Sequence, residues 1–237
     1  MRRLGHVDEL LDGPLDDPAV LRGNLRDLAR VNRHLGGVAL SLRAVDALAG
    51  DRQTLDLVDI GTGGADIPVA LLEHAARSGR TWRMTGVDSR PEILAAAAAA
   101  DPRLTATPGL SLHVGDGRGL PFADDAFDVA HTSLVVHHLE PEAVVLLLGE
   151  MARVSRLGLV VNDLVRGRLA LAGAWALTRV ATRNRYTRHD APLSVRRAYS
   201  RAEMEGMVAD AGLTVVDRFG GIAGHRWAIA AVNRDAA

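Results

Sequence analysis

From residue 55 onward, short apolar runs alternate with segments of helical periodicity, and this alternation constrains the fold more than any other feature of the chain. The apolar runs that we interpret as strands lie at 55–60, 82–87, 110–114, 127–131 and 157–161. The helices expected between them lie at 65–78, 91–100 and 141–155. Because a parallel strand pair needs a crossover of about a dozen residues, usually a helix, this order predicts a mostly parallel sheet covered on both faces.

The pattern changes in the last third of the chain. We expect a helical region at 165–182, an irregular Arg-rich stretch after it, and a helix at 201–211. Two further apolar runs, 213–219 and 225–233, are too close together for a parallel crossover, so they are expected to pair antiparallel. The predicted fold class is α/β, a doubly wound, mostly parallel, seven-stranded sheet with an antiparallel C-terminal hairpin.

The N-terminal part is expected to form a helical cover. Asp17 followed by Pro18 is typical of a helix start, and apolar residues then recur at helical spacing until Gly36 separates a second helix from the first. The expected organisation is a helical cover, 1–50, and a Rossmann-like domain, 51–237, with an inserted lid at about 166–200.

The composition limits the chemistry. All 28 basic residues are Arg and the chain has no Cys, which excludes Schiff-base chemistry, thiol nucleophiles and disulfides. The net charge of -1 gives no global field that would attract nucleic acid. Neither a signal-peptide core nor an apolar run of bilayer-spanning length is found, so we expect a cytoplasmic protein without a membrane span.

Glycines and acidic residues follow three successive predicted strands. The candidate ligand-contacting residues there are Asp59, Gly61, Gly63, Asp66, Asp88, Ser89, Asp116 and Gly117. Glycines allow a ligand to approach the backbone closely, and a carboxylate after the second strand can accept hydrogen bonds from ribose hydroxyls. Each acid alone could instead be a turn former or a helix cap. Three such signals at one edge of a parallel sheet predict a nucleoside-binding crevice.

The motifs LVDIGTGGADIP, TGVDSR, GDGRGLPF and FDVAHTSLVVHHL, in that order, resemble the class I S-adenosylmethionine-dependent methyltransferases. The similarity covers about residues 55–165 and favours the small-molecule branch, which includes quinone and natural-product methyltransferases. It implies S-adenosyl-L-methionine as the cofactor and a methyltransferase domain within 51–237. The residue roles that it implies are Gly61 and Gly63 under the methionine part, Asp59 orienting the glycine turn, Asp88 on the ribose, and Asp116 with Gly117 at the adenine. The family's usual third glycine is Ala65 here.

Two further residues complete the expected cofactor site. Arg33, near the end of the first helix, is a candidate for binding the donor's carboxylate, although a basic helix end that complements the helix dipole explains it equally well. Ser133 lies in the segment after the fourth strand, which in related enzymes lies beside the sulfonium. A nicotinamide dinucleotide is the rival ligand, but its G-x-G-x-x-G fingerprint requires Gly at position 66, where this chain has Asp.

The expected catalytic residues are His137, His138 and Asp163. A phenolic acceptor must lose a proton, and His titrates closest to neutral pH, so one histidine is expected at the transfer centre. The alternative is that both histidines only orient the loop. As sequence neighbours they are expected to point in different directions, and Asp163 is expected to pair with a His or Arg or to bind a substrate hydroxyl. No required metal is expected, because His131 stands where metal-dependent catechol methyltransferases carry Asp.

The segment 166–201 contains nine Arg and one acidic residue. We interpret it as a lid in which Arg166, Tyr186 and His189 face an anionic or phenolic acceptor. A solvated helix face is the alternative interpretation. The partner expected is a small-molecule acceptor and not nucleic acid, and a homodimer and docking to an acidic carrier protein are left open.

The expected function is methyl transfer to a small molecule, as an O-methylation of a phenolic, polyketide or quinone-like acceptor in natural product biosynthesis. Three alternatives stay open. The first is a protein that keeps the cofactor pocket but catalyses a non-methyl reaction such as cyclisation. The second is a nucleic-acid methyltransferase, for which this chain lacks base-stacking aromatic residues beside its Arg residues. The third is an NAD-dependent oxidoreductase.

Overall fold

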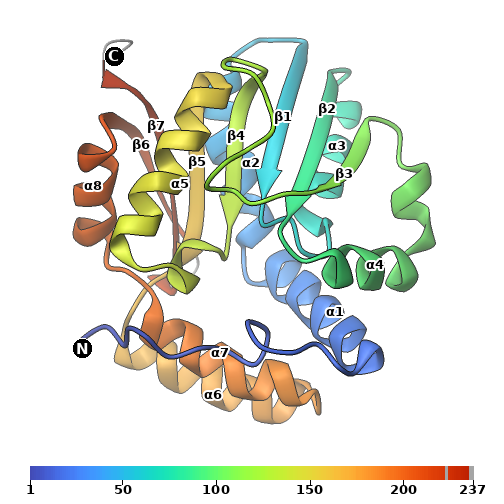
Figure 1. The fold of residues 1–237 in the computed structure, drawn as a ribbon, viewed down its shortest axis with the longest axis vertical. Coiled ribbons are helices and arrows are strands. Elements are labelled where there is room, and N and C mark those ends of the chain that lie inside the picture. Colours follow the sequence, from blue (N-terminus) through green and yellow to red (C-terminus); the bar gives the residue numbers. More distant parts are fainter. Residues whose placement is uncertain (222–223, 235–237) are drawn as a thin grey trace.

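The sheet has seven strands in the order β3-β2-β1-β4-β5-β7-β6 in the computed structural model, which describes residues 1–221 and 224–234 (Figure 1). The strands are β1 Thr54–Ile60, β2 Thr81–Asp88, β3 Leu110–Val114, β4 Phe127–Ser133, β5 Ser155–Leu164, β6 Leu213–Gly220 and β7 Arg226–Asn233. Strands β1 to β5 pair in parallel, and β7 is antiparallel to both β5 and β6. The predicted fold class is confirmed.

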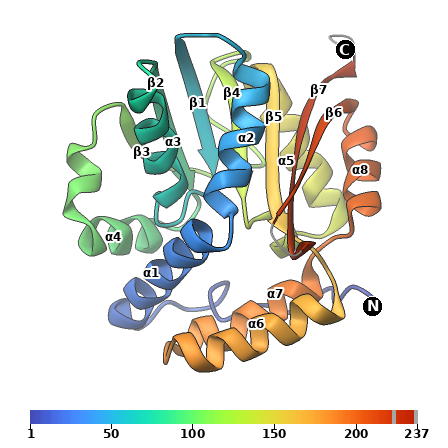
Figure 2. The same cartoon turned by 180° about the vertical axis from the view of Figure 1, so that it is seen from behind.

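Helices cover both faces of this sheet. They are α1 Pro18–His34, α2 Gly37–Ala49, α3 Asp66–Arg77, α4 Pro91–Ala100, α5 Pro141–Val154, α6 Arg168–Ala181, α7 Arg185–Arg197 and α8 Arg201–Asp210. Helices α2 and α3 pack on one face, and α5 and α8 on the other (Figure 2). Proline stands in the first turn of α1, α4 and α5, where its missing N–H costs nothing. Among the described residues, no helix has the length and apolar character that a bilayer crossing requires.

The central strands are buried on both faces, which explains why they read as continuous apolar runs. The fully buried residues include Leu57, Val58, Val129, Ala130, Leu159 and Val160. Alternate residues along these strands enter two separate clusters, one with α5 and α8 and the other with α2 and α3. This two-sided burial is typical of parallel sheets and fixes the positions at which the strands end.

The carboxyl ends of the parallel strands are capped by α1, α6 and α7, which lie across that edge of the sheet (Figure 1). Helix α7 packs against both α1 and α6. The segment before α1 runs along α7, because the backbone N–H groups of Leu10 and Leu11 donate to the carboxylate of Asp190. The cap therefore combines parts of the chain that are far apart in sequence.

Helix α7 corrects one expectation, since the stretch after residue 182 is not irregular. Asn184 caps the helix by accepting from the N–H groups of Tyr186 and Thr187, although Pro192 lies inside it. The proline is an unfavourable local signal inside a helix. Burial of one face, including Tyr186 and Val195, overrides it.

Candidate active site

The carboxyl ends of β1, β2 and β3 meet at a cavity of about 210 Å³, which we call the strand-end cavity. Its lining residues are Ile60, Gly61, Ser89, Gly115, Asp116, Gly117, Arg118, Val135, Leu139 and Leu147. The segments after three successive strands therefore converge, as the glycine and acid pattern predicts. Gly61, Ser89, Asp116 and Gly117 are the predicted cofactor residues among them.

The glycine turn after β1 has a geometry that only glycine adopts without strain. Gly61 has a φ of 71° and Gly63 a φ of 54°. A Cβ atom at Gly61 would overlap the side chain of Val135, which packs directly against the turn. The N–H of Gly63 donates to Asp88 Oδ2 at 3.0 Å, which ties the turn to the end of β2.

Asp88 lies in a buried position beside this turn. Its Oδ1 accepts a second hydrogen bond, from the N–H of Arg90 at 3.0 Å. Burial raises the pKa of the Asp88 carboxyl, and the two backbone hydrogen bonds act in the opposite direction. The carboxylate is thereby oriented at the end of β2, next to the glycine turn, although Asp88 is not among the residues that line the strand-end cavity.

Ala65 replaces a glycine of the related motif without changing the backbone conformation. Its φ is 55°, in the left-handed region, where a residue with a Cβ costs about 1–2 kcal/mol. The Ala65 methyl group is fully buried in a cluster with Leu21 and Leu25 of α1. Packing of this methyl group offsets the backbone strain, so the departure at position 65 leaves the turn intact.

Asp59 belongs to a buried chain of hydrogen bonds behind the turn. Its Oδ1 pairs with His131 Nδ1 at 2.6 Å, and His131 Nε2 lies 2.7 Å from Ser41 Oγ. Asn162 Nδ2 donates to the same Ser41 oxygen at 2.8 Å. The guanidinium of Arg226 then donates to Asn162 Oδ1 at 2.7 Å. Asp59 therefore orients the site through this network and does not line the strand-end cavity.

Arg226 is the centre of the same network. It is fully buried, and burial lowers its pKa to about 10. Its other two nitrogens donate to Asn32 Oδ1 at 2.8 Å and to Ser133 Oγ at 2.7 Å. Asn32 Nδ2 in turn donates to Asp66 Oδ2 at 3.0 Å. The network thus engages three predicted cofactor residues, Asp59, Asp66 and Ser133. Its members Asn32, Ser41 and Arg226 were not predicted, because they come from remote segments.

Two predicted cofactor contacts lie at the surface. Arg33 is exposed on α1, whereas its neighbour Asn32 points into the network just described. Helical geometry places adjacent residues on different faces, so only one of the two can point inward. Asp116 is at the rim of the strand-end cavity, where its carboxylate pairs with Arg118 at 2.7 Å and has a lowered pKa. Gly117 packs closely against the end of β1. A Cβ at Gly117 would lie 2.5 Å from Ile60 Cγ2, so the close approach of its backbone to Ile60 requires glycine.

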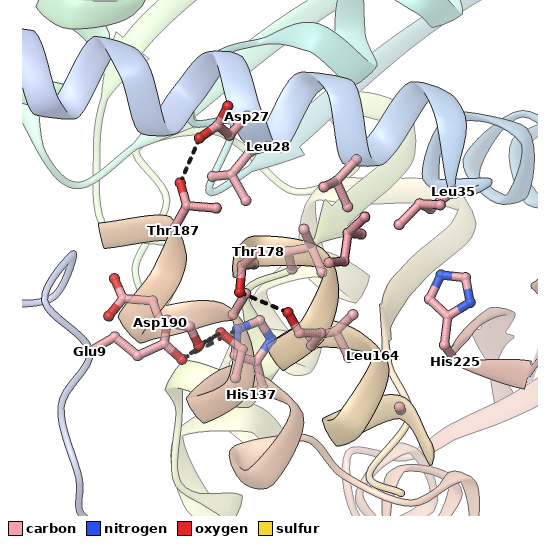
Figure 3. A pocket seen from close by; sticks show the side chains of 18 of the residues that line it. Glu9, Asp27, Leu28, Leu35, His137, Leu164, Thr178, Thr187, Asp190 and His225 are labelled. Atoms are coloured by element: carbon pink, nitrogen blue, oxygen red, sulfur yellow. Dashed lines mark hydrogen bonds and ion pairs between the residues drawn. The ribbon is translucent and has the colours of Figure 1, made fainter. Parts of the chain in front are cut away.

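A second cavity, of about 500 Å³, lies beneath α1, α6 and α7, and we call it the helix-covered cavity. Its walls are mostly apolar and include Leu28, Val31, Leu35, Leu134, Leu164, Leu169 and Leu177. Figure 3 shows Glu9, Asp190 and His137 close together on one side, whereas Asp27 and His225 lie elsewhere around the cavity. Leu134 lines this cavity while the next residue, Val135, lines the strand-end cavity, so the segment after β4 separates the two.

His137 and His138 both line the helix-covered cavity. They form the short 3₁₀ helix η2, Val136–His138, and their ring centroids are 4.3 Å apart with the planes inclined by 35°. The expectation that the neighbours point in different directions is wrong, because the tight turn of η2 turns both rings towards the N-terminal segment. His137 Nδ1 lies 2.7 Å from Asp163 Oδ1, as the pairing expected of Asp163 requires.

Glu9 is the main residue that the sequence did not indicate. It is 4% exposed, it accepts from Ser194 Oγ at 2.8 Å, and burial raises its pKa to about 7. Each oxygen of its carboxylate lies 3.8 Å from the Nε2 atom of one histidine, His137 or His138. No local motif marks Glu9, because its position depends on the N-terminal segment packing along α7.

The three predicted substrate residues lie outside the lining of the helix-covered cavity. Arg166 donates to the carbonyls of Met1 and Ala198 and pairs with Glu203, Tyr186 is buried, and His189 pairs with Asp190. The α7 residues that do line the cavity are Thr187, Asp190, Ala191 and Ser194. Their spacing of three and four residues defines one helix face, which excludes positions 186 and 189.

Comparison with known proteins gives a family for part of the chain. Residues 57–158 match a family described as "Methyltransferase domain". An uncharacterized methyltransferase of Synechocystis sp. is 30% identical over 102 residues, which is 43% of this chain and 42% of that protein. The chain thus matches less than half the length of this relative.

Solved structures resemble almost the whole chain at low sequence identity. A SAM-dependent methyltransferase from Aquifex aeolicus has a TM-score of 0.62 at 17% identity and covers 91% of this chain and 97% of its own. An O-methyltransferase family 2 protein from Planctomyces limnophilus, in complex with apigenin, has a TM-score of 0.66 at 20% identity, with 94% and 63% covered. Residues 57–158 therefore match a methyltransferase domain, and the chain has the Rossmann-like fold of these solved structures.

Proposed function

We propose that this protein is an S-adenosylmethionine-dependent methyltransferase that methylates a hydroxyl group of a small, largely apolar acceptor. The observation that carries the proposal is the position of the segment after β4. Its adjacent residues Leu134 and Val135 line two different cavities, one at the strand ends and one beside the histidines. A donor in the first cavity and an acceptor in the second would meet at this segment, as an in-line transfer requires.

The residues that would hold the cofactor fit an adenosyl group. Gly61 and Gly117 bring bare backbone to the strand-end cavity, and Asp88 is an oriented carboxylate at the end of β2. When bound, S-adenosylmethionine supplies a methyl group that its positive sulfur makes electrophilic. Asp66 stands at the N-terminus of α3, where a dinucleotide pyrophosphate would bind, and a carboxylate there disfavours the oxidoreductase alternative.

The wall of the helix-covered cavity supplies proton-accepting groups. Asp163 accepts from His137 Nδ1, which leaves the Nε2 lone pair of His137 towards the cavity. During methyl transfer the O–H bond of the acceptor would break, and its proton would pass to Nε2 of His137. The acceptor oxygen then forms the new O–C bond, and the electron pair of the S–C bond returns to sulfur. His137, His138 and Asp163 are the residues that we propose for this step.

The acceptor class follows from the shape and chemistry of the helix-covered cavity. Apolar residues, most of them leucines, form most of its wall, and Glu9, His137 and His138 form a polar cluster, so it suits an apolar body with one hydroxyl. A phenolic, polyketide or quinone-like compound of natural product biosynthesis has this form. Two proteins of similar fold support this class: the neighbour in complex with apigenin and the CMeT domain of citrinin polyketide synthase. Residues 1–50 would act as the cover and about 166–200 as the lid.

The test is turnover with methyl-labelled S-adenosylmethionine and a panel of phenolic and quinol acceptors. We expect S-adenosylhomocysteine and methylated product in equal amounts, and a fall of kcat of at least about 10-fold in His137→Ala. A product formed without consumption of the donor would instead support a non-methyl reaction such as cyclisation. Methylation of nucleic acid with a steep salt dependence would also overturn the small-molecule proposal. If His137→Ala and His138→Ala both keep full activity, the proton-accepting role fails.

A further inference from the structure

The side chains of Glu9, His137 and His138 bring three potential metal-ligand atoms close together. One ligand atom from each residue can be chosen so that all three lie within 4.8 Å of one another. His137 Nε2 lies 3.8 Å from Glu9 Oε1, and His138 Nε2 lies 3.8 Å from Glu9 Oε2. These separations exceed hydrogen-bond length, and neither Nε2 atom has a hydrogen-bond partner within residues 1–221 and 224–234. Three donor groups therefore converge without bonding to each other.

The opposite side of each imidazole ring is held by a carboxylate. His137 Nδ1 lies 2.7 Å from Asp163 Oδ1, and His138 Nδ1 lies 2.8 Å from Asp12 Oδ1. Histidines that ligate a metal generally donate their other ring nitrogen to a carboxylate or carbonyl, which fixes the tautomer and directs the free lone pair at the ion. Both histidines of this cluster have that arrangement, and their carboxylate partners, Asp163 and Asp12, come from two different parts of the chain.

Arg197 and Ser194 fix the remaining parts of the cluster. The Arg197 guanidinium donates to the carbonyls of His137 and His138 at 3.1 and 2.7 Å, which holds the backbone of η2. Its third nitrogen donates to Asp12 Oδ2 at 3.0 Å. Ser194 Oγ donates to Glu9 Oε1 and so orients that carboxylate. Every donor side chain is thus positioned by a neighbour before any ligand binds.

We propose that Glu9, His137 and His138 bind a divalent transition-metal ion, with Zn²⁺ as the best match. Two imidazoles and one carboxylate form a ligand set typical of Zn²⁺ sites that keep a coordination position open. Bonds of about 2.0–2.2 Å place the ligand atoms of a tetrahedral site about 3.4 Å apart. The three ligand atoms all lie within 4.8 Å of one another, so each pair would need to approach by about 1.4 Å at most to close on an ion.

The site would face the acceptor, because all three residues line the helix-covered cavity. A divalent ion lowers the pKa of a hydroxyl that coordinates it, so the hydroxyl would release its proton to solvent at neutral pH. The histidines would then act on the acceptor through the ion. This catalytic role rests on the proposed function, whereas the binding of the ion rests on the geometry of the cluster alone.

The test begins with calorimetric titration of ZnCl₂ into the full chain after removal of metals with EDTA. We expect one Zn²⁺ per chain, a Kd raised more than about 100-fold in His138→Ala, and a Kd raised about 10–100-fold in Asp12→Asn. His34→Ala, at an exposed histidine outside the cluster, is the matched control and should leave the Kd unchanged. Co²⁺ gives a second readout, because a visible absorption band of the wild type should be lost in Glu9→Gln.

Absence of stoichiometric binding, or binding that His138→Ala leaves unchanged in a protein with normal circular dichroism, overturns the metal site. S-adenosylhomocysteine is titrated into the same metal-free protein to separate this result from the proposed function. If Zn²⁺ does not bind while the nucleoside binds and methyl transfer proceeds, the metal inference fails and the methyltransferase stands. If Zn²⁺ binds but the nucleoside does not, the metal site stands and the proposed function fails.

Discussion

At the scale of single residues, the strand ends show why some site residues could be predicted. Gly61 directly follows β1 and Asp88 is the last residue of β2, so their positions depend on local sequence. The structure joins these two strand ends through the hydrogen bond from Gly63 to Asp88. Glu9 and Arg226 reach their sites through packing of remote segments. No spacing in the sequence brings a residue of the N-terminal segment beside His137, so such residues could not be predicted.

Gly61→Ala tests whether close backbone approach is essential to the strand-end cavity. The new methyl group would overlap Val135, and the φ of 71° costs a residue with a Cβ about 1–2 kcal/mol. We expect S-adenosylhomocysteine binding to weaken at least 10-fold, measured by calorimetry.

Gly206→Ala is the control for this substitution. Gly206 lies inside α8, and a Cβ there meets nothing within 4 Å. The change should leave nucleoside binding intact and raise the free energy of unfolding by up to about 1 kcal/mol. Equal binding in both variants would show that the glycine turn does not approach the ligand.

At the scale of secondary-structure elements, most of the sheet could be predicted because buried parallel strands are recognisable as apolar runs. Strand β3 was predicted with its observed limits, Leu110–Val114, and α4 likewise at Pro91–Ala100. Helix α7 could not be predicted, because Pro192 lies inside it and tertiary packing of one face stabilises it. Because this helix was not predicted, the wrong residues were chosen as substrate contacts. The helix face towards the cavity contains Thr187 and Asp190, and not Tyr186 and His189.

Arg226→Met tests the buried network that joins α1, β4, β5 and β7. The change leaves acceptors on Asn32, Ser133 and Asn162 without their donor, and breaking a buried charged network typically costs about 3–5 kcal/mol. We expect the free energy of unfolding, measured in urea, to fall by this amount. Arg218→Met, at an exposed pair with Glu205, should change it by about 1 kcal/mol or less. Similar losses in the two variants would contradict the network's role.

The capping box of α8 should contribute to the dependence of stability on pH. Burial alone would raise the pKa of Glu203, but Arg166 and Ser200 lower it from 4.5 to about 2. Its contribution is therefore present above pH 4.5 and lost as the pH falls towards 2. Because the side chain is 44% exposed, we expect about 1 kcal/mol at most. Urea unfolding of Glu203→Gln should show a smaller loss of stability between pH 5 and 3 than the wild type, and an unchanged loss would refute this contribution.

At the scale of the whole molecule, the two cavities lie on either side of one short segment, Ser133 to Val135. The sheet supplies the strand-end cavity, whereas α1, α6 and α7 complete the helix-covered cavity (Figure 1). Under the proposed function, donor and acceptor sites should respond to mutation independently, because different elements form them.

Ala174→Trp tests this independence by filling the helix-covered cavity from α6. Ala174 lines that cavity, and Ala176, two residues further on, is exposed and does not. We expect Ala174→Trp to raise the KM for the acceptor at least about 10-fold without changing S-adenosylhomocysteine binding. Ala176→Trp should leave both unchanged. A loss of nucleoside binding in Ala174→Trp alone would show that the two cavities are a single site.

Calorimetric titration of S-adenosylhomocysteine tests whether the ends of β1, β2 and β3 together bind an adenosyl group. We expect one nucleoside per chain, binding weakened about 10–100-fold in Asp88→Ala, and no effect of Asp124→Ala at the exposed pair with Arg153. NADH should not bind. Binding of NADH that depends on Asp88, with no binding of S-adenosylhomocysteine, would show that these strand ends form a different site.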